Sequence, residues 1–259
     1  MMPARMLLTA CLVLFVAIVP SILAETVDHY QEAIDCFIVP YSHGIVTMTV
    51  TVGMNEPARY SLEMWTRGKD VTSSIIVDAN APFMIGLAFL EENNQVTAWW
   101  PSIKVEKTFD SSQSEEEVGF GMGRLDRIIW HSEDYEAKLV KETESSYQYR
   151  VAPGDASMAD FSYGIIDVNK SDGTLVRAEF YDADDVAIET DTVSGYQDIT
   201  ADSGSTILYP MNFASDDITN NKTTTMEYTK IEFAASIDDS VFTVDFLKAQ
   251  SESVLNQTY

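Results

Sequence analysis

The stretch GIVTMTVTVG at residues 44–53 constrains the fold more than any other part of the chain. Val46, Met48, Val50 and Val52 alternate with polar residues, so that every second side chain is apolar. Successive side chains of a β-strand point to opposite faces, and this period of two therefore predicts a strand with one apolar face. A chain built from such strands packs the apolar face of an antiparallel sheet against a core.

Most of the remaining chain continues this pattern. We expect roughly nine to eleven strands, counted by strand spacing and turn signals, in nearly sequential order, with turns at residues 92–94 and 170–173. With two or three short helices, they predict an α+β chain that is mainly antiparallel β and has one domain. The further strands are expected within residues 58–68, 72–79, 84–101, 135–140, 146–151, 161–169, 174–182, 186–199, 206–213 and 223–233.

Helical spacing of apolar residues appears just before the strand-rich region. It predicts a short helix over residues 26–37, ended by Pro40 and Gly44. The segment 238–250 predicts a closing strand or turn followed by a helical tail.

Residues 103–134 interrupt the strand pattern. An acidic, serine-rich stretch leads to the glycine-rich GFGMG at residues 119–123. Leu125, Ile128 and Ile129 then recur at the i, i+3 and i+4 spacing of a helix. We therefore expect a short helix after a flexible approach.

Residues 1–24 are typical of a signal peptide. Arg5 precedes an apolar run over residues 6–19, and the small-residue stretch SILA ends at Ala24. The run is shorter than the about 20 apolar residues that a membrane-spanning helix needs. We expect cleavage after Ala24 and export to the periplasm, with secretion as the alternative.

The remaining residues, 25–259, suit one large domain. LTAC, ending at Cys11, resembles a lipoprotein-processing motif, but the apolar run continues beyond Cys11 instead of preceding it. Removal of the signal peptide leaves Cys36, which cannot form an internal disulfide. Its apolar neighbours in AIDCFIVP predict a small buried side chain.

The net charge of −25 argues against several classes of partner. Such a chain repels phosphate backbones and anionic lipid headgroups, so we expect no nucleic-acid partner. The acidic residues are spread along the chain, which indicates a solvated surface.

Recognisable catalytic and metal-binding motifs are missing from the sequence. GFGMGRLD departs from a dinucleotide-binding motif at Arg124, and the three histidines are scattered. DVNKSDG at residues 167–173 resembles the start of a calcium loop, but its glycine comes one position late, where a hairpin turn needs it. We expect no metal, no cofactor and no enzymatic activity. A pair of catalytic carboxylates among the 41 acidic residues stays an open alternative.

Two adjacent tryptophans stand out among the apolar residues. In TAWWPS at residues 97–102, Trp99 and Trp100 must point to opposite faces of a strand. An ordinary two-sided core explains this pair, and so does a sheet that wraps an apolar ligand. Methionine on a strand face, as at Met48 and Met64, is unusual and adapts to irregular apolar partners.

The order and spacing of several segments resemble a known family. Residues 61–102, GTLVRAEFYDADD at 173–185, ILYPMNF at 207–213 and the closing stretch from 223 resemble the periplasmic lipoprotein carriers of the LolA/LolB type. They are most similar to its longer branch, the outer membrane lipoprotein-sorting proteins. This resemblance implies a single sheet curved into an incomplete barrel around a few short helices, which act as a lid.

The resemblance also implies a function for residues 25–259. It implies a lipid- or lipoprotein-binding domain, expected to be monomeric, that carries acyl chains toward the outer membrane between an inner-membrane release complex and an outer-membrane acceptor. An envelope-stress sensor and a secreted enzyme are the alternatives. The candidate residues for an apolar cavity are Val46, Met48, Val50, Leu62, Met64, Leu90, Trp99, Trp100, Leu125, Ile128, Ile129, Trp130, Phe180, Met226 and Tyr228.

Two features of the expected lid stay open at this point. The helix containing Ile129 is suited either to cover the apolar space and move away, or to fill it as a fixed plug. The resemblance implies an arginine that latches the lid, with Arg59 and Arg67 as candidates.

Overall fold

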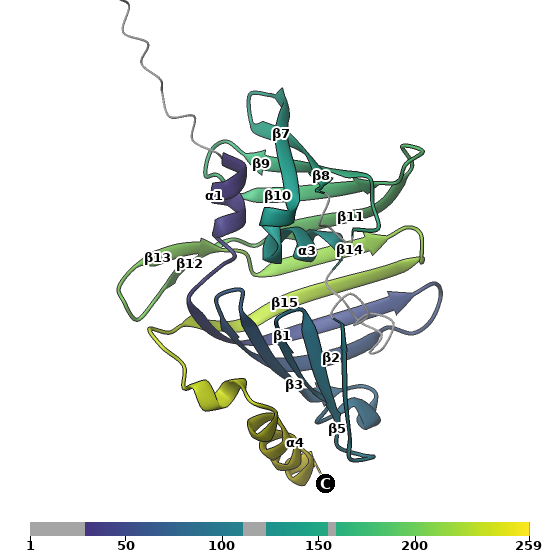
Figure 1. Cartoon of the computed structure of the whole chain (residues 1–259), viewed down its shortest axis with the longest axis vertical. Coiled ribbons are helices and arrows are strands. Elements are labelled where there is room, and N and C mark those ends of the chain that lie inside the picture. Colours follow the sequence, from purple (N-terminus) through teal and green to yellow (C-terminus); the bar gives the residue numbers. More distant parts are fainter. Residues whose placement is uncertain (1–28, 111–122, 155–158, 259) are drawn as a thin grey trace, which may run out of the picture.

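A computed structural model describes residues 29–110, 123–154 and 159–258. Its first six strands form one half of a thirteen-stranded sheet, and each is antiparallel to the next (Figure 1). In the first strand, every second residue from position 42 to position 50 is buried, as the alternation predicts. These strands are β1 (Tyr41–Val52), β2 (Ala58–Arg67), β3 (Val71–Ala79), β4 (Ala88–Glu92), β5 (Gln95–Trp100) and β6 (Val105–Asp110).

The other half of the sheet comes from the later part of the chain. A separate hairpin of β12 (Gln197–Thr200) and β13 (Thr206–Tyr209) projects from it. The strands of this half are β7 (Tyr135–Glu142), β8 (Ser146–Pro153), β9 (Tyr163–Asn169), β10 (Leu175–Tyr181), β11 (Ala187–Ser194), β14 (Asn212–Asp217) and β15 (Lys222–Phe233).

The two halves join where β1 pairs with β15. The pairing runs from Ser42 opposite Phe233 to Val52 opposite Lys222. The sheet order is β6-β5-β4-β3-β2-β1-β15-β14-β11-β10-β9-β8-β7, so β6 and β7 are its edges and the sheet is not closed. This large antiparallel sheet with a few helices confirms the predicted fold class.

One face of the sheet runs without interruption across the junction. Met48 lies opposite Met226 on β15. Met226 lies opposite Phe213 on β14, which in turn lies opposite Val193 on β11. Directly opposed residues of an antiparallel pair project to the same side. We call the side that carries Met48, Met226 and Phe213 the inner face, and the other side the outer face.

Helices cover different parts of the two faces (Figure 1). α1 (His29–Asp35) and α3 (Arg124–Trp130) pack on the inner face of the later half, where Ile34 and Ile128 are fully buried. α4 (Val244–Thr258) packs on the outer face of the first half, where Leu247 meets Ile75. Short 3₁₀ turns are η1 (Pro82–Met84), η3 (Ser132–Asp134) and η4 (Asp239–Phe242).

Several boundaries differ from the sequence predictions. The chain forms fifteen strands among the described residues, because Gly195 at φ 68° separates β11 from β12 and Pro210 separates β13 from β14. β6 lies in a segment where no strand was expected. Gly44 lies inside β1 and does not end the first helix.

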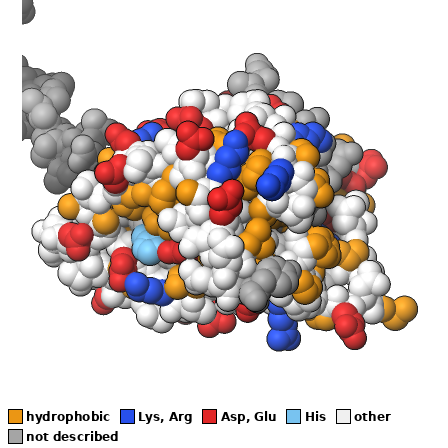
Figure 2. Space-filling model, turned by 90° about the horizontal axis from the view of Figure 1, so that it is seen from below, with side chains coloured by type: hydrophobic (Ala, Val, Ile, Leu, Met, Phe, Trp, Pro, Cys, Tyr) orange, Lys and Arg blue, Asp and Glu red, His pale blue; other side chains and the backbone are white. Residues whose placement is uncertain are grey.

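Hydrophobic side chains also reach the surface. Seen from below, the molecule shows them gathered between acidic and basic side chains (Figure 2). Within the described part of the chain, the helices are too short or too polar to cross a membrane. The predicted signal peptide lies outside the described residues.

Candidate functional site

The inner face of the first half is lined by apolar side chains. Val46, Met48, Val50 and Leu62 are at most 5% exposed, and they belong to one cluster with Met226. Three other predicted cavity residues, Met64, Trp100 and Tyr228, are partly buried against this cluster. β1 and β2 therefore place their apolar positions where the alternation predicted, facing inward.

The tryptophan pair divides between the two faces. Trp100 packs with the inner cluster, as do Val96 and Ala98, because residues two apart on β5 share a face. Trp99 packs on the outer face under α4, where Lys248 Nζ lies 5.0 Å from its ring centroid.

Leu90 lies on the same outer face as Trp99. The prediction that Leu90 and Trp99 line the inner space is therefore wrong. Both β4 and β5 are apolar on both faces, since α4 covers their outer side, so no polar alternation marks which residue points inward.

On the later half of the inner face, α3 meets the sheet through its apolar stripe. Leu125, Ile128 and Ile129 are at most 3% exposed and form one cluster with Phe180 and Val193. A space of about 10 Å³ remains between α3, β11 and β14, which is about the smallest that can hold one water molecule. In this arrangement the helix seals its part of the inner face.

The two apolar clusters meet at Phe213, which packs against both of them. Phe37, which follows α1, has its ring centroid 5.8 Å from that of Phe213. The apolar lining is therefore continuous from the first half of the inner face to the part beneath the helices.

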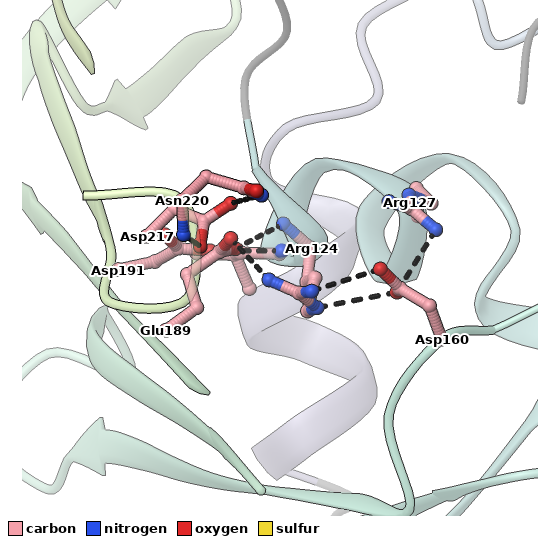
Figure 3. Close-up of polar contacts among 8 residues, drawn as sticks. Arg124, Arg127, Asp160, Glu189, Asp191, Asp217 and Asn220 are labelled. Carbon is pink, nitrogen blue, oxygen red and sulfur yellow. Dashed lines mark hydrogen bonds and ion pairs between the residues drawn. The ribbon is translucent and has the colours of Figure 1, made fainter. Parts of the chain in front are cut away.

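An ionic network, buried except for the half-exposed Asp160, holds the beginning of α3 (Figure 3). Arg124 Nη1 and its backbone N–H both donate to the carboxylate of Glu189 on β11, each over 2.5 Å. Arg124 also forms a two-bond pair with Asp160, over 2.8 and 3.2 Å. The backbone N–H of Leu125 donates to Asp191 Oδ2 over 2.9 Å. Two carboxylates thus bind the N–H groups at the first turn of the helix, the end where negative charge is favoured.

This network was not predicted from the sequence. Glu189 and Asp191 fall in register with the apolar Val193, which was the signal that their side chains point inward. Of the two arginines proposed as a latch, Arg67 instead pairs with Asp239 over 2.9 Å and lies over the ring of Phe242 on the α4 side. Arg59 is exposed on β2.

Burial shifts the pKa values of the charged groups in this network. Burial, and then the neighbouring charge of Glu189, raises the pKa of Asp191 well above its ordinary value. Burial also raises the pKa of Glu189, although contacts with Arg124 oppose the change. Burial alone would lower the pKa of Arg124, but Glu189 and Asp160 raise it above its usual value.

A second titratable group, Asp126, lies beside the apolar stripe of α3. Asp126 accepts a hydrogen bond from Trp130 Nε1 over 2.7 Å. Burial and the nearby charge of Glu91 on β4 raise the pKa of Asp126 to about 7. Glu91 belongs to the first half of the sheet, so its charge acts on α3 from the opposite half.

The described residues contain no group of three or more metal-ligating side chains. The stretch that resembles a calcium loop is the turn of the β9–β10 hairpin, where the carboxylate of Asp172 accepts from Thr174 N–H over 3.1 Å. Cys36 is half-buried, and its thiol donates to the carbonyl of Ala33.

The sequence matches one family model. A family model described as "Uncharacterized protein" matches residues 86–249, which is well over half of the chain. A comparison with curated proteins finds no match.

Solved structures resemble the whole fold. A LolA superfamily protein from Nitrosomonas europaea is 17% identical, with 84% of this chain and 97% of that chain covered and a TM-score of 0.64. A DUF1329 family protein from Desulfovibrio piger is 14% identical, with 85% of this chain and 96% of that chain covered and a TM-score of 0.67. A putative outer membrane lipoprotein-sorting protein domain from Vibrio parahaemolyticus is 15% identical, with 85% of this chain and 97% of that chain covered and a TM-score of 0.65. At such identities the likeness establishes the fold alone.

Proposed function

Because the chain belongs to the family whose model matches residues 86–249, and because its fold is LolA-like, we propose that it carries acyl chains of lipids or lipoproteins. The observation that carries this proposal is the continuous apolar inner face of a sheet that is not closed. The later half of this face lies beneath the short helices α1 and α3, which pack on it through buried apolar side chains.

The chemistry of the lining suits an acyl cargo. Met48, Met64 and Met226 are flexible and adapt to irregular apolar partners. Burial of one CH₂ group contributes about 0.8 kcal/mol, so that one long acyl chain contributes on the order of 10 kcal/mol. The cargo enters this space when α3 moves away from the sheet, since the closed arrangement leaves no room for it.

The cellular setting follows from the same proposal. The predicted signal peptide places the carrier in the periplasm. There it receives cargo from an inner-membrane release complex and passes it to an outer-membrane acceptor, with no chemical step and no cofactor.

Gentle purification from the exporting cell, followed by mass spectrometry of the bound material, tests the proposal. We expect an acyl lipid or an acylated protein to leave with the native protein. Purified protein that is free of lipid, and that does not take up a fluorescent fatty acid, would contradict the proposal.

A pair of matched variants sharpens this test. Met64→Asp places a charge on the half-buried inner face, and Leu90→Asp places one at a half-buried position of the outer face. Both variants bury a charge at a similar depth and should lose a similar amount of stability. Only Met64→Asp should lower the amount of bound lipid. Equal loss of lipid in both variants would argue against the inner face as the site.

A further inference from the structure

Four neighbouring turns at one end of the sheet each carry an exposed, large apolar side chain. Met54 in the β1–β2 turn is fully exposed, Phe83 in η1 is 73% exposed, and Ile103 in the β5–β6 turn is 67% exposed. Ile218 in the β14–β15 turn is 53% exposed. Turns normally place polar residues at such positions, so these four side chains have no role in the core.

The four turns form one continuous rim. Gly53 N–H donates to the carbonyl of Asn221 over 2.8 Å, which joins the β1–β2 turn to the β14–β15 turn. The side-chain amide of Asn80 donates to the carbonyl of Pro57 over 2.9 Å, which joins the β1–β2 turn to the segment before η1. At the far end, Pro101 lies against Gly86, which follows η1. The β14–β15 and β1–β2 turns lie one below the other on the right of Figure 1.

The rim is close to neutral in a strongly acidic protein. Its segments are residues 53–57, 80–86, 101–104 and 218–221, and their charged residues are Glu56 and Lys104. The whole chain carries a net charge of −25. An apolar and nearly neutral rim therefore differs from the strongly acidic chain as a whole.

We propose that this rim docks on the uncharged interface of a lipid bilayer, with Met54, Phe83, Ile103 and Ile218 inserted among the lipid chains. Each of these side chains projects singly from its own turn, and a fluid lipid phase accepts such projections without a matching set of pockets. A protein partner would need four spaced holes. The lysine beside Ile103 is suited to extend its amine toward the headgroups while its stem stays in the apolar layer. This docking surface is distinct from the proposed cargo site on the inner face.

Flotation with vesicles tests the proposal. The protein is used in the form that the cell exports, with vesicles of phosphatidylcholine and phosphatidylethanolamine. We expect the native protein to float with these vesicles, and the variant Met54→Ser/Phe83→Ser/Ile103→Ser/Ile218→Ser to partition at least about tenfold more weakly. A control variant, Leu139→Ser/Val140→Ser/Val176→Ser, removes exposed apolar side chains from strands away from the rim and should float like the native protein.

The response to charge distinguishes insertion from adsorption. Binding through a neutral apolar rim should be almost independent of salt, and anionic lipid should weaken it because the rest of the protein is acidic. Native protein that does not float, or a control variant that loses binding as strongly as the rim variant, would overturn the proposal. Loss of transfer to a protein acceptor in the rim variant, without vesicle binding by the native protein, would assign the rim to a protein partner and also overturn it.

Cargo retention is measured in the same samples. The rim variant should keep its fluorescent fatty acid in the absence of vesicles. Failure of docking is thereby separated from failure of the proposed carrier function.

Discussion

At the scale of single residues, Gly123 is packed against the oxygen atoms that hold α3. A Cβ atom added there would lie 2.7 Å from Ser215 Oγ and 2.9 Å from Glu189 Oε1. At φ 89° the backbone is also in a region that favours glycine. The residue before α3 is therefore restricted both by its own conformation and by the network beside it.

Gly123→Ala should disturb the attachment of α3, and Gly68→Ala provides the matched control. Gly68 also has a positive φ, 54°, but an added Cβ meets no atom within 4 Å. We expect the control to lose about 1 kcal/mol of unfolding free energy from backbone strain. Gly123→Ala should lose about 1–3 kcal/mol more, both from overpacking and because φ 89° with ψ −174° is a backbone region essentially restricted to glycine. Urea denaturation measures both, and equal losses would show that the network tolerates the crowding.

Asp126 should make the stability of the protein depend on pH. Its pKa in the folded protein, about 7, is above the ordinary value of 3.8, so the folded state holds the proton more tightly than the unfolded state. The contribution is fully present below about pH 4 and is lost as the pH rises to about 7 and beyond. Asp126→Asn should reduce this fall in melting temperature between pH 4 and pH 8. An unchanged pH profile in the variant would contradict the assignment.

The sequence predicts correctly which face a side chain points to where one side of the strand is polar. Val46, Met48, Val50 and Leu62 alternate with polar neighbours, and the structure places them on the inner face. Trp99 and Trp100 do not alternate with polar residues in this way, because α4 buries the outer side of β5 as well. Glu189 and Asp191 were not identified, because a strand pattern assigns charged residues to the solvent side unless their partner is known. That partner, Arg124, is distant in the sequence.

At the scale of secondary-structure elements, α3 is the part whose movement would control access to the inner face. Its apolar stripe is buried, but its polar attachment is concentrated at Arg124 and Leu125 in the first turn. The structure describes the helix in its seated position, which both a movable lid and a fixed plug would adopt.

Ile129→Asp separates these two roles. If α3 is a plug, the buried charge should lower the unfolding free energy by about 3–5 kcal/mol, with no increase in the uptake of an apolar dye by the native state. If α3 is a lid, the helix should leave the sheet, so that the melting temperature changes little while dye uptake and cargo release increase. Leu247→Asp is the control, since Leu247 is equally buried on α4 over the outer face. It should destabilise the protein without a specific effect on cargo release.

Helices and strands were predictable from the sequence where only one of their faces is buried. The short helix α3 was predicted from the spacing of Leu125, Ile128 and Ile129, and it was found at residues 124–130. β6 was missed because it is an edge strand whose first four residues are exposed, and such a strand needs no apolar alternation. The additional strands arose where Gly195 and Pro210 interrupt segments that were apolar on both sides of the break.

At the scale of the whole molecule, the net charge of −25 should oppose folding through mutual repulsion. The melting temperature should therefore rise with sodium chloride, most steeply as the screening length falls from about 10 Å at 0.1 M to about 3 Å at 1 M. Calorimetry over this range measures the effect. A melting temperature that is flat or falls with salt would show that ion pairs outweigh the repulsion.

The position of β15 in the sheet also sets the order in which the protein can fold. β15 is the last strand in the sequence, yet it lies between β1 and β14 and joins the two halves. Pairing of β1 with β15 links residues that are about 180 positions apart, and such distant contacts form slowly. A chain that is still emerging from the ribosome can form local hairpins but cannot complete the inner face. The same arrangement that delays folding leaves the two halves of the sheet unjoined until residues 222–233 have been made, and an incompletely folded chain is what export by the predicted signal peptide would need.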